Sequence, residues 1–383
     1  MKFFLNSYLL ISLIMWETYG LDNGDISTAD FRHIVIIPDV HGDSDALLKS
    51  LWGSLKRLEP SYNIAFEVFN DVFYNRIIKG KQSHAPLSTR RDVVVVQLGD
   101  LVDRGPDSAY CISIMGAVSE LIGWRVVRLY GNHELLSMLA DGSEYIHSRE
   151  AIGFGGVASR DASFQQGGFH YNELTKNFVG FAKISSSYPS LLPGLLHKRN
   201  PNTLFVHGGV DLEWLSRQLG ADELTISALN ERFAELASEG REGQDQLSGR
   251  GSILWTRVMA ETPEEEICST IVDEVLTGFG VARIIVGHTP QDNMLVNTRC
   301  DGRIVLADVR MSRWMNDSRE ANPVAIIMSM NRDGSSLDSM VAHYVDPESG
   351  QCHRQQVLVA PPSPSGFHME NLQFRRGQKR SSV

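Results

Sequence analysis

The sequence predicts an α/β protein built of layered sheets and helices, and three observations lead to this expectation. Short apolar runs of strand length alternate with amphipathic, helix-like stretches along the 383 residues. Five of the apolar runs end in the same way, with a glycine beside an acidic, amide or imidazole side chain. The composition is ordinary for a globular protein, with 42% hydrophobic residues, and no repeat or sharp boundary divides it. We therefore expect one domain with insertions.

The first part of the chain predicts three strand–helix pairs, at residues 33–58, 93–121 and 124–136. In the first pair, leucines recur every three or four residues from Leu47 onward and mark one face of a helix. The second pair opens on four consecutive valines, a run typical of a buried strand. Residues 59–92 show no clear period, and we expect them to form a loop or an insertion.

The remainder of the chain continues the alternation. Helical regions are predicted around 171–188 and over 223–239, and loops over the glycine-rich residues 153–168 and the polar residues 241–252. Five apolar runs predict further strands, the last three of them consecutive and more antiparallel in character: 202–206, 282–286, 303–309, 323–330 and 340–345.

The formal net charge is −10, and this acidic balance argues against a protein that binds nucleic acid or an anionic membrane through bulk charge. We therefore expect no nucleic-acid partner. An anionic substrate stays possible, because a site that holds metal ions is locally positive whatever the net charge.

Both ends of the chain have a distinct composition. Lys2 and the apolar run Phe3–Trp16 predict a secretory signal peptide over residues 1–20, so that the mature chain would start at Leu21 in the secretory pathway. A signal anchor or a frayed apolar N-terminus are the alternatives. No other segment approaches a spanning length, so we expect no stable membrane span after cleavage.

Residues 361–383 are rich in proline and serine, then basic, and predict a disordered tail; a partner-binding tail is the alternative.

The chain has four cysteines, an even number that permits two disulfides in three possible connectivities. Cys111 lies in a predicted helix and is also explained as a small buried apolar residue. No CxxC motif is present, so the cysteines predict neither a zinc knuckle nor a redox pair.

The ends of five predicted strands supply the residues most suited to chemistry. In order, these are Asp39 with His41, Asp100 with Asp103, Asn132 with His133, His207, and His288. Any single acid or histidine after a strand is usually a turn residue. In open α/β sheets, however, ligands bind beyond the carboxyl ends of the strands, so all five ends are expected to converge on one edge.

The donor set points to two metal ions. It combines carboxylate, imidazole and amide groups without a thiolate, which suits Mn, Fe or Zn better than Mg or Ca. Eight candidate groups are too many for one tetrahedral ion and about right for two ions that share a carboxylate. Two such ions are a known device for in-line attack on phosphorus.

The motifs "PDVHGD", "GDLVDRG", "GNHE", "VHGG" and "VGHT", in this order, resemble the phosphoprotein phosphatases, a family of binuclear metallophosphatases. "ILWTR" and "ADVRMS" are most similar to the Shewanella-like branch. The resemblance covers roughly residues 32–345 and is specific because the whole ordered set is present. It implies a calcineurin-like layered β-sandwich flanked by helices, which we place over residues 21–360.

The resemblance also implies a role for each motif residue. Asp39 and His41 would bind the first metal, Asp100 would bridge both metals, and Asn132, His207 and His288 would bind the second. His133 would be the general acid, oriented by Asp103, and Arg104 and Arg257 would bind the phosphate. Two departures stand out: Pro38 replaces the usual glycine, with little harm expected, and Arg310 replaces a frequent glycine, where we expect an altered turn rather than an added active-site cation.

The implied activity is hydrolysis of phosphomonoesters in phosphorylated proteins, at phosphotyrosine or phosphoserine/threonine, by direct attack of a metal-bridging hydroxide. The Shewanella-like resemblance favours tyrosine. One alternative is a dinucleoside polyphosphate or cap hydrolase of the bacterial-type branch, whose members often alter the acid and the arginine that here are Asp103 and Arg104. Another is a catalytically dead phosphate-binding protein, which would have lost ligands.

Overall fold

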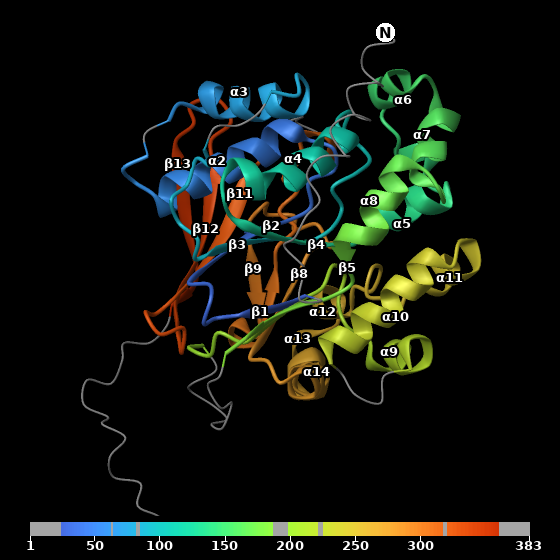
Figure 1. The fold of residues 1–383 in the computed structure, drawn as a ribbon. Coiled ribbons are helices and arrows are strands. Elements are labelled where there is room, and N and C mark those ends of the chain that lie inside the picture. Colours follow the sequence, from blue (N-terminus) through green and yellow to red (C-terminus); the bar gives the residue numbers. More distant parts are fainter. Residues whose placement is uncertain are drawn as a thin grey trace, which may run out of the picture.

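The structure, a computed structural model, describes residues 24–62, 64–81, 85–186, 198–220, 225–316 and 320–359 (Figure 1). The expected signal peptide and basic tail lie outside these residues. Within them, no helix combines the length and the apolar character needed to cross a membrane.

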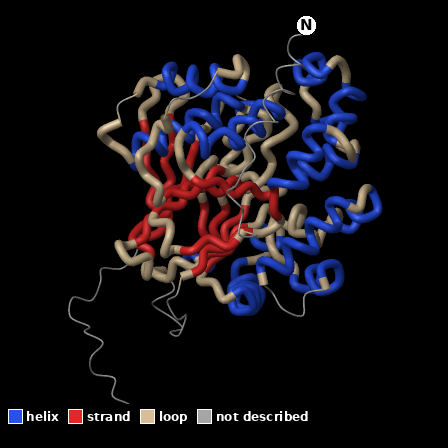
Figure 2. The backbone as a smooth tube through the Cα atoms, viewed as in Figure 1, coloured by secondary structure: helices blue, strands red, loops and turns tan. Residues whose placement is uncertain are grey.

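Two β-sheets form the centre of the molecule and helices surround them (Figure 2). The seven-stranded sheet has the order β13-β12-β11-β2-β3-β4-β5. Its strands are β2 (His33–Ile37), β3 (Val93–Gln97), β4 (Arg125–Leu129), β5 (Phe178–Val179), β11 (Val324–Met330), β12 (Leu337–Val345) and β13 (Cys352–Val359). The half from β2 to β5 is parallel, and the half from β13 through β11 to β2 is antiparallel. All five residues of β3 are buried, which explains its continuous apolar sequence.

The six-stranded sheet has the order β1-β6-β7-β8-β10-β9. Its strands are β1 (Asp25–Ser27), β6 (Ala182–Ser185), β7 (Thr203–Phe205), β8 (Arg283–Val286), β9 (Asn297–Arg299) and β10 (Ile304–Leu306). Strands β7, β8 and β10 are parallel neighbours and are fully buried. This arrangement confirms the predicted layered sandwich.

Helices cover the sheets in three groups (Figure 1). The first group contains α2 (Ser44–Leu58), α3 (Phe66–Ile77) and α4 (Ser108–Leu121), of which α2 contacts β11 and β12 and α4 contacts β4. The second contains α5 (Asn132–Leu139), α6 (Ser148–Phe154), α7 (Val157–Phe164) and α8 (Phe169–Asn177). The third contains α9 (Leu212–Leu219), α10 (Ile226–Ser238), α11 (Arg241–Gln246), α12 (Val258–Glu261), α13 (Glu264–Glu266) and α14 (Val272–Phe279).

Five of the predicted segments differ from the structure. Residues 59–92 contain helix α3, whose buried Phe69, Phe73 and Ile77 recur every four residues in an otherwise polar stretch. The glycine-rich residues 153–168 are largely helical: Gly155 and Gly156 have positive φ and form the turn between α6 and α7. The expected loop 241–252 begins with helix α11.

The helix expected around 171–188 ends at Asn177, and strands β5 and β6 follow it. A related error concerns 303–309, expected among consecutive antiparallel strands. Strand β10 instead pairs in parallel with β8 in the six-stranded sheet, while β11 and β12 belong to the other sheet. The error arises because sequence proximity does not reveal that the chain changes sheets after Leu306.

One disulfide joins the third helical group to the six-stranded sheet. Cys268, in a π-helical turn between α13 and α14, is bonded to Cys300, which directly follows β9. Cys111 is buried and free, and Cys352 is exposed and free. The structure therefore contains one of the bonds that the even cysteine count permitted.

Replacing both bonded cysteines, as Cys268→Ser with Cys300→Ser, should lower the free energy of unfolding. The bond closes a loop with a sequence separation of 32. A loop of this size restricts the unfolded chain by about 3–4 kcal/mol in the chain-entropy description. Denaturant unfolding measures the loss, with Cys352→Ser as the control. Equal stability of the double variant and the wild type would contradict a stabilising bond.

Candidate active site

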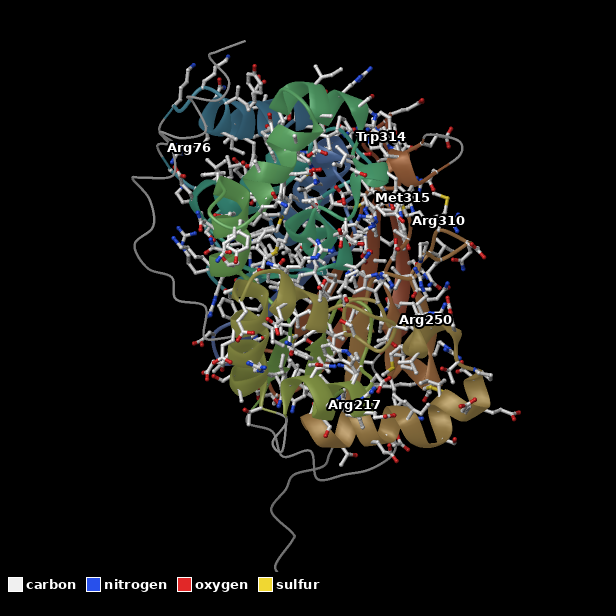
Figure 3. All side chains as sticks on the ribbon, turned by 90° about the vertical axis from the view of Figure 1, so that its right-hand side faces the viewer. Arg76, Arg217, Arg250, Arg310, Trp314 and Met315 are labelled. Atoms are coloured by element: carbon white, nitrogen blue, oxygen red, sulfur yellow. A yellow bond between two sulfur atoms is a disulfide. The ribbon has the colours of Figure 1, made fainter. Side chains whose placement is uncertain are left out.

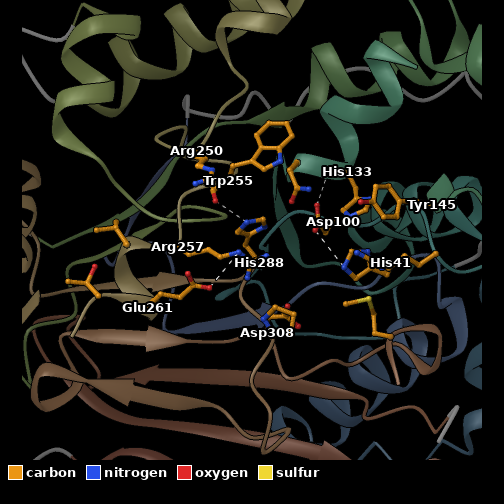
Figure 4. A pocket seen from close by; sticks show the side chains of 16 residues that line it. His41, Asp100, His133, Tyr145, Arg250, Trp255, Arg257, Glu261, His288 and Asp308 are labelled. Atoms are coloured by element: carbon orange, nitrogen blue, oxygen red, sulfur yellow. Dashed lines mark hydrogen bonds and ion pairs between the residues drawn. The ribbon is translucent and has the colours of Figure 1, made fainter. Parts of the chain in front are cut away.

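The five strand ends that carry the predicted ligands come from both sheets. Strands β2, β3 and β4 lead to the ligands near residues 39–41, 100 and 132, and strands β7 and β8 lead to His207 and His288. The sequence predicted a single sheet edge; in the structure, the ends of two sheets meet. The side chains nonetheless converge, as predicted (Figure 4).

The backbone is strained where it delivers these side chains. His41, Asp100, Asp103, Arg104 and His288 all have positive φ, between 47° and 67°. Each such non-glycine residue costs of order 1–3 kcal/mol, and strain of this kind concentrates at functional sites. The sharp turns bring the side chains back over the ends of the strands that precede them.

Two clusters of metal-donor atoms share one residue. In one cluster the donor atoms of His41, Asp100 and His133 lie within 4.8 Å of one another, and in the other those of Asp100, His207 and His288 do. The Asp100 carboxylate contributes its two oxygens to different sides: Oδ2 lies 3.6 Å from His41 Nε2, and Oδ1 lies 3.4 Å from His207 Nε2. A carboxylate in this position suits the bridging role that the sequence assigned to Asp100.

Backbone carbonyls fix which ring nitrogen each histidine presents. Nδ1 of His207 lies 2.8 Å from the carbonyl oxygen of Leu98, and Nδ1 of His41 lies 3.4 Å from that of Val102. The Nε2 atoms of both rings therefore face Asp100. Metal-binding histidines are commonly oriented in this way by their second nitrogen. The Asn132 amide oxygen lies 3.1 Å from His207 Nε2, beside the second cluster.

The buried acids of the site need positive charge. Asp39 is 1% exposed, and burial and the Asp308 carboxylate raise its pKa well above the usual value. Burial also raises the pKa of Asp308 to about 6. Asp39 Oδ1 and Asp308 Oδ2 are buried without a hydrogen-bond partner among the described residues. Unpartnered buried oxygens of this kind are rare in proteins, and they fit a site built for cations.

The histidines compensate part of this charge. Burial by itself would raise the pKa of Asp100, but the imidazoles of His207, His133 and His41 lower it well below the usual value. Burial would lower the pKa of His207, but the carboxylates of Asp100 and Asp39 raise it to about 10. The residues present, their donor chemistry and their charge therefore fit a centre of two metal ions, which Asp39 and His41 would hold on one side and Asn132, His207 and His288 on the other.

His133 differs from its neighbours in its partners. Its Nδ1 lies 2.9 Å from Oδ2 of Asp103, which is completely buried. The other ring nitrogen is left for the cavity, of which His133 is a lining residue. A carboxylate that holds one imidazole nitrogen while the other faces the substrate is the usual arrangement of an acid–base histidine. The predicted pair of His133 and Asp103 is thus assembled.

The site opens into a cavity of about 750 Å³. Arg104 and Arg257 both line it, as predicted for phosphate-binding residues. The Arg104 guanidinium lies 4.9 Å from the centre of the Tyr145 ring, and Arg257 Nε lies 3.9 Å from a carboxylate oxygen of Glu261 (Figure 4). Both arginines thus line the same cavity as His41, Asp100 and His288 of the metal-donor clusters.

The lining of the cavity also includes residues that the sequence analysis did not single out. Trp255, Arg250 and Met315 line it; the last two lie one above the other in Figure 3. Arg310 is absent from the lining residues: it has a positive φ of 54° and pairs with the exposed Asp292. The positive φ of Arg310 fits the altered turn that was expected there.

Two buried acids that support the site were also missed. Glu134 accepts hydrogen bonds from the backbone N–H groups of Gly131, Asp100 and Leu101, at 2.7–2.8 Å. It thereby ties the start of α5 to the turn that carries Asp100. Asp308 follows β10 and faces Asp39. The sequence offered one signal for each: Glu134 completes "GNHE", and Asp308 follows a strand of apolar residues.

The calcineurin-like phosphoesterase family description matches residues 32–292. The chain belongs to this family. It is 24% identical to Shewanella-like protein phosphatase 2 of Arabidopsis thaliana, over 73% of this chain and 75% of that protein. It is 24% identical to Shewanella-like protein phosphatase 1 of Plasmodium berghei, over 59% of each protein. These relatives support its placement in the Shewanella-like branch.

An uncharacterized protein of Schizosaccharomyces pombe is 30% identical over 57% of this chain and 62% of that protein. The chain thus spans about three fifths of the fission yeast and Plasmodium relatives. The fold resembles the crystal structure of a cold-active protein-tyrosine phosphatase from a psychrophilic Shewanella species. The TM-score is 0.59 at 19% identity, covering 87% of this chain and 82% of that one.

Proposed function

We propose that the chain is a metal-dependent phosphoprotein phosphatase that hydrolyses phosphomonoesters of tyrosine, serine or threonine without a phosphoenzyme. The observation that carries the proposal is the combination of the shared carboxylate of Asp100 with the His133–Asp103 pair beside it. Membership of the calcineurin-like phosphoesterase family supports the reaction class.

The residues divide the work of a single displacement at phosphorus. When bound, two metal ions would activate the attacking water and neutralise charge on the phosphoryl oxygens. Arg104 and Arg257 would hold further phosphoryl oxygens from the cavity wall and stabilise their developing charge. His133 would donate a proton to the departing ester oxygen, and Asp103 would keep its ring oriented.

Two features support a protein substrate. The cavity of about 750 Å³ has Tyr145 and Trp255 in its wall, which suits the aromatic ring of phosphotyrosine. The names of the similar proteins, protein phosphatases and a protein-tyrosine phosphatase, point in the same direction. The dinucleoside polyphosphate alternative is less well supported, because Asp103 and Arg104 are both present; Asp103 contacts His133, and Arg104 lines the cavity.

A substrate panel tests the proposal. The purified chain with Mn²⁺ should release phosphate from phosphotyrosine and phosphothreonine peptides faster than it degrades a dinucleoside tetraphosphate. Chelation should abolish the release, because the nucleophile depends on the metal ions. Turnover of the nucleotide alone would show that the substrate class is wrong. Binding of phosphopeptide without any turnover would favour the phosphate-binding alternative.

The variant His133→Asn separates proton donation from metal binding. It should keep its metal content while the rate on phosphoserine falls by about two to four orders of magnitude, the usual contribution of general acid catalysis. The loss should be smaller on nitrophenyl phosphate, whose phenolate departs with less need of a proton. Rates across leaving groups of graded acidity, with elemental analysis in parallel, measure both effects. A uniform loss, or loss of metal, would contradict the role assigned to His133.

A further inference from the structure

We propose that Arg160 is a positioning residue for the general acid: its guanidinium locks the Asp103 carboxylate in the orientation that holds the His133 ring. The inference rests on the proposed function, since it deepens the role given to His133. No motif singled out Arg160, which lies on α7 in a segment that the sequence predicted to be a loop.

The two oxygens of Asp103 have different partners. Oδ2 lies 2.9 Å from His133 Nδ1, and Oδ1 accepts a hydrogen bond of 2.5 Å from Arg160 Nη2. The Asp103 carboxylate is inaccessible to water. With His133 as its single partner, the carboxylate would turn easily, because rotation of an aspartate carboxylate has a broad energy profile. A partner on the second oxygen removes this freedom and fixes the direction of the bond to His133.

Arg160 also binds the helix that carries the general acid. The same Nη2 atom donates to Ser137 Oγ at 3.1 Å, and Ser137 lies on α5, one turn after His133. One guanidinium nitrogen therefore connects both members of the pair, the carboxylate directly and the imidazole through its helix. A shift of Asp103 relative to α5 would have to break one of these bonds.

Arg160 is itself buried among packed side chains. It is 1% exposed, and its guanidinium lies 4.5 Å from the centre of the Phe164 ring on the same helix. Its Nε lies 3.8 Å from a carboxylate oxygen of Glu150 on α6. The guanidinium thus approaches Asp103 from a packed surface of two helices. This packing limits the movement of the guanidinium relative to Asp103.

A purely structural ion pair is the competing explanation, and the chain offers a matched example of one. Arg128 on β4 donates to Glu173 on α8 at 2.7 Å and is 7% exposed. This pair also connects the core to the helices that follow α5, but the structure gives it no contact with Asp103 or His133. Buried ion pairs often contribute little net stability, whereas removing one partner is costly. Arg128→Gln and Arg160→Gln should therefore both destabilise the fold. Only Arg160→Gln should also weaken proton donation by His133.

The first test is the dependence of the rate on the leaving group. Arg160→Gln should lose about tenfold to a hundredfold on phosphoserine, a part of the general-acid contribution, and much less on nitrophenyl phosphate. Its metal content should stay unchanged. Arg128→Gln should affect both substrates equally. Equal losses on both substrates in Arg160→Gln would overturn the proposal and leave Arg160 a structural residue.

A double-mutant cycle tests whether the effect passes through His133. If it does, the variant carrying both His133→Asn and Arg160→Gln should be no slower on phosphoserine than His133→Asn alone. Independent, multiplying losses would overturn the proposal. Arg160→Lys, which keeps the charge, should recover part of the rate and serves in place of Arg160→Gln if that variant does not fold.

The orientation of the ring has a readout that needs no substrate. The proton on His133 Nδ1, held by Asp103, should give a downfield NMR signal, assigned by its absence in His133→Asn. The signal should broaden or vanish in Arg160→Gln and persist in Arg128→Gln. A wild type that is inactive on monoesters but shows this pattern would refute the proposed function and leave the positioning role standing. An unchanged signal in Arg160→Gln would overturn that role.

Discussion

The Asp100 carboxylate is buried among three imidazoles at the point where the ends of two sheets meet. Its two oxygens face His41 and His207, and Oδ1 also accepts the backbone N–H of His133. Such a charge is tolerated in a protein interior only when cations and donors surround it closely. The segments around Asp100 therefore have to supply cations and hydrogen-bond donors. This requirement explains several residues of the nearby turns.

The close approach of backbone to this carboxylate explains two features of the turns. A Cβ atom on Gly131 would lie 2.1 Å from Asp100 Oδ1, so only glycine fits there. Asp100 has a φ of 53°, and Glu134 stabilises the strained turn by accepting its backbone N–H. The strained backbone at Asp100 and the need for glycine at position 131 thus both follow from the position of the Asp100 carboxylate. The start of α5 also places His133 beside Asp100 in the first donor cluster, where its Nδ1 contacts Asp103.

A feature of the site could be predicted from the sequence when neighbouring residues determine it, and not when it depends on contacts between distant segments. The convergence of the candidate ligand residues was predictable, because each follows an apolar strand directly and the carboxyl ends of parallel strands are where ligands bind. That the strands belong to two sheets was not predictable, since pairing depends on contacts between distant segments. The same limit applies to Arg160, which reaches Asp103 across 57 residues from a helix hidden in a glycine-rich segment. Asp308 was missed because its position opposite Asp39 exists only in the folded chain.

The errors in secondary structure have related causes. Helix α3 has a narrow apolar stripe, and tertiary packing against α4 compensates for its polar sequence. In α6 and α7 the two glycines form the turn between short helices, although glycine pairs usually indicate a loop. Helix α7 carries Arg160 to the Asp103 carboxylate, and α6 places Glu150 beside Arg160, so a segment expected to be a loop contacts the candidate site.

Elemental analysis of the variant Asp100→Asn tests the central claim most directly. If the Asp100 carboxylate holds both metal ions, the wild type should retain two per chain and the variant should lose both after dialysis, because an amide is a weak and uncharged ligand. Glu173→Gln, which removes a carboxylate that pairs with Arg128 away from the two donor clusters, is the control and should retain metal. Two tightly held ions per chain in Asp100→Asn would contradict the account.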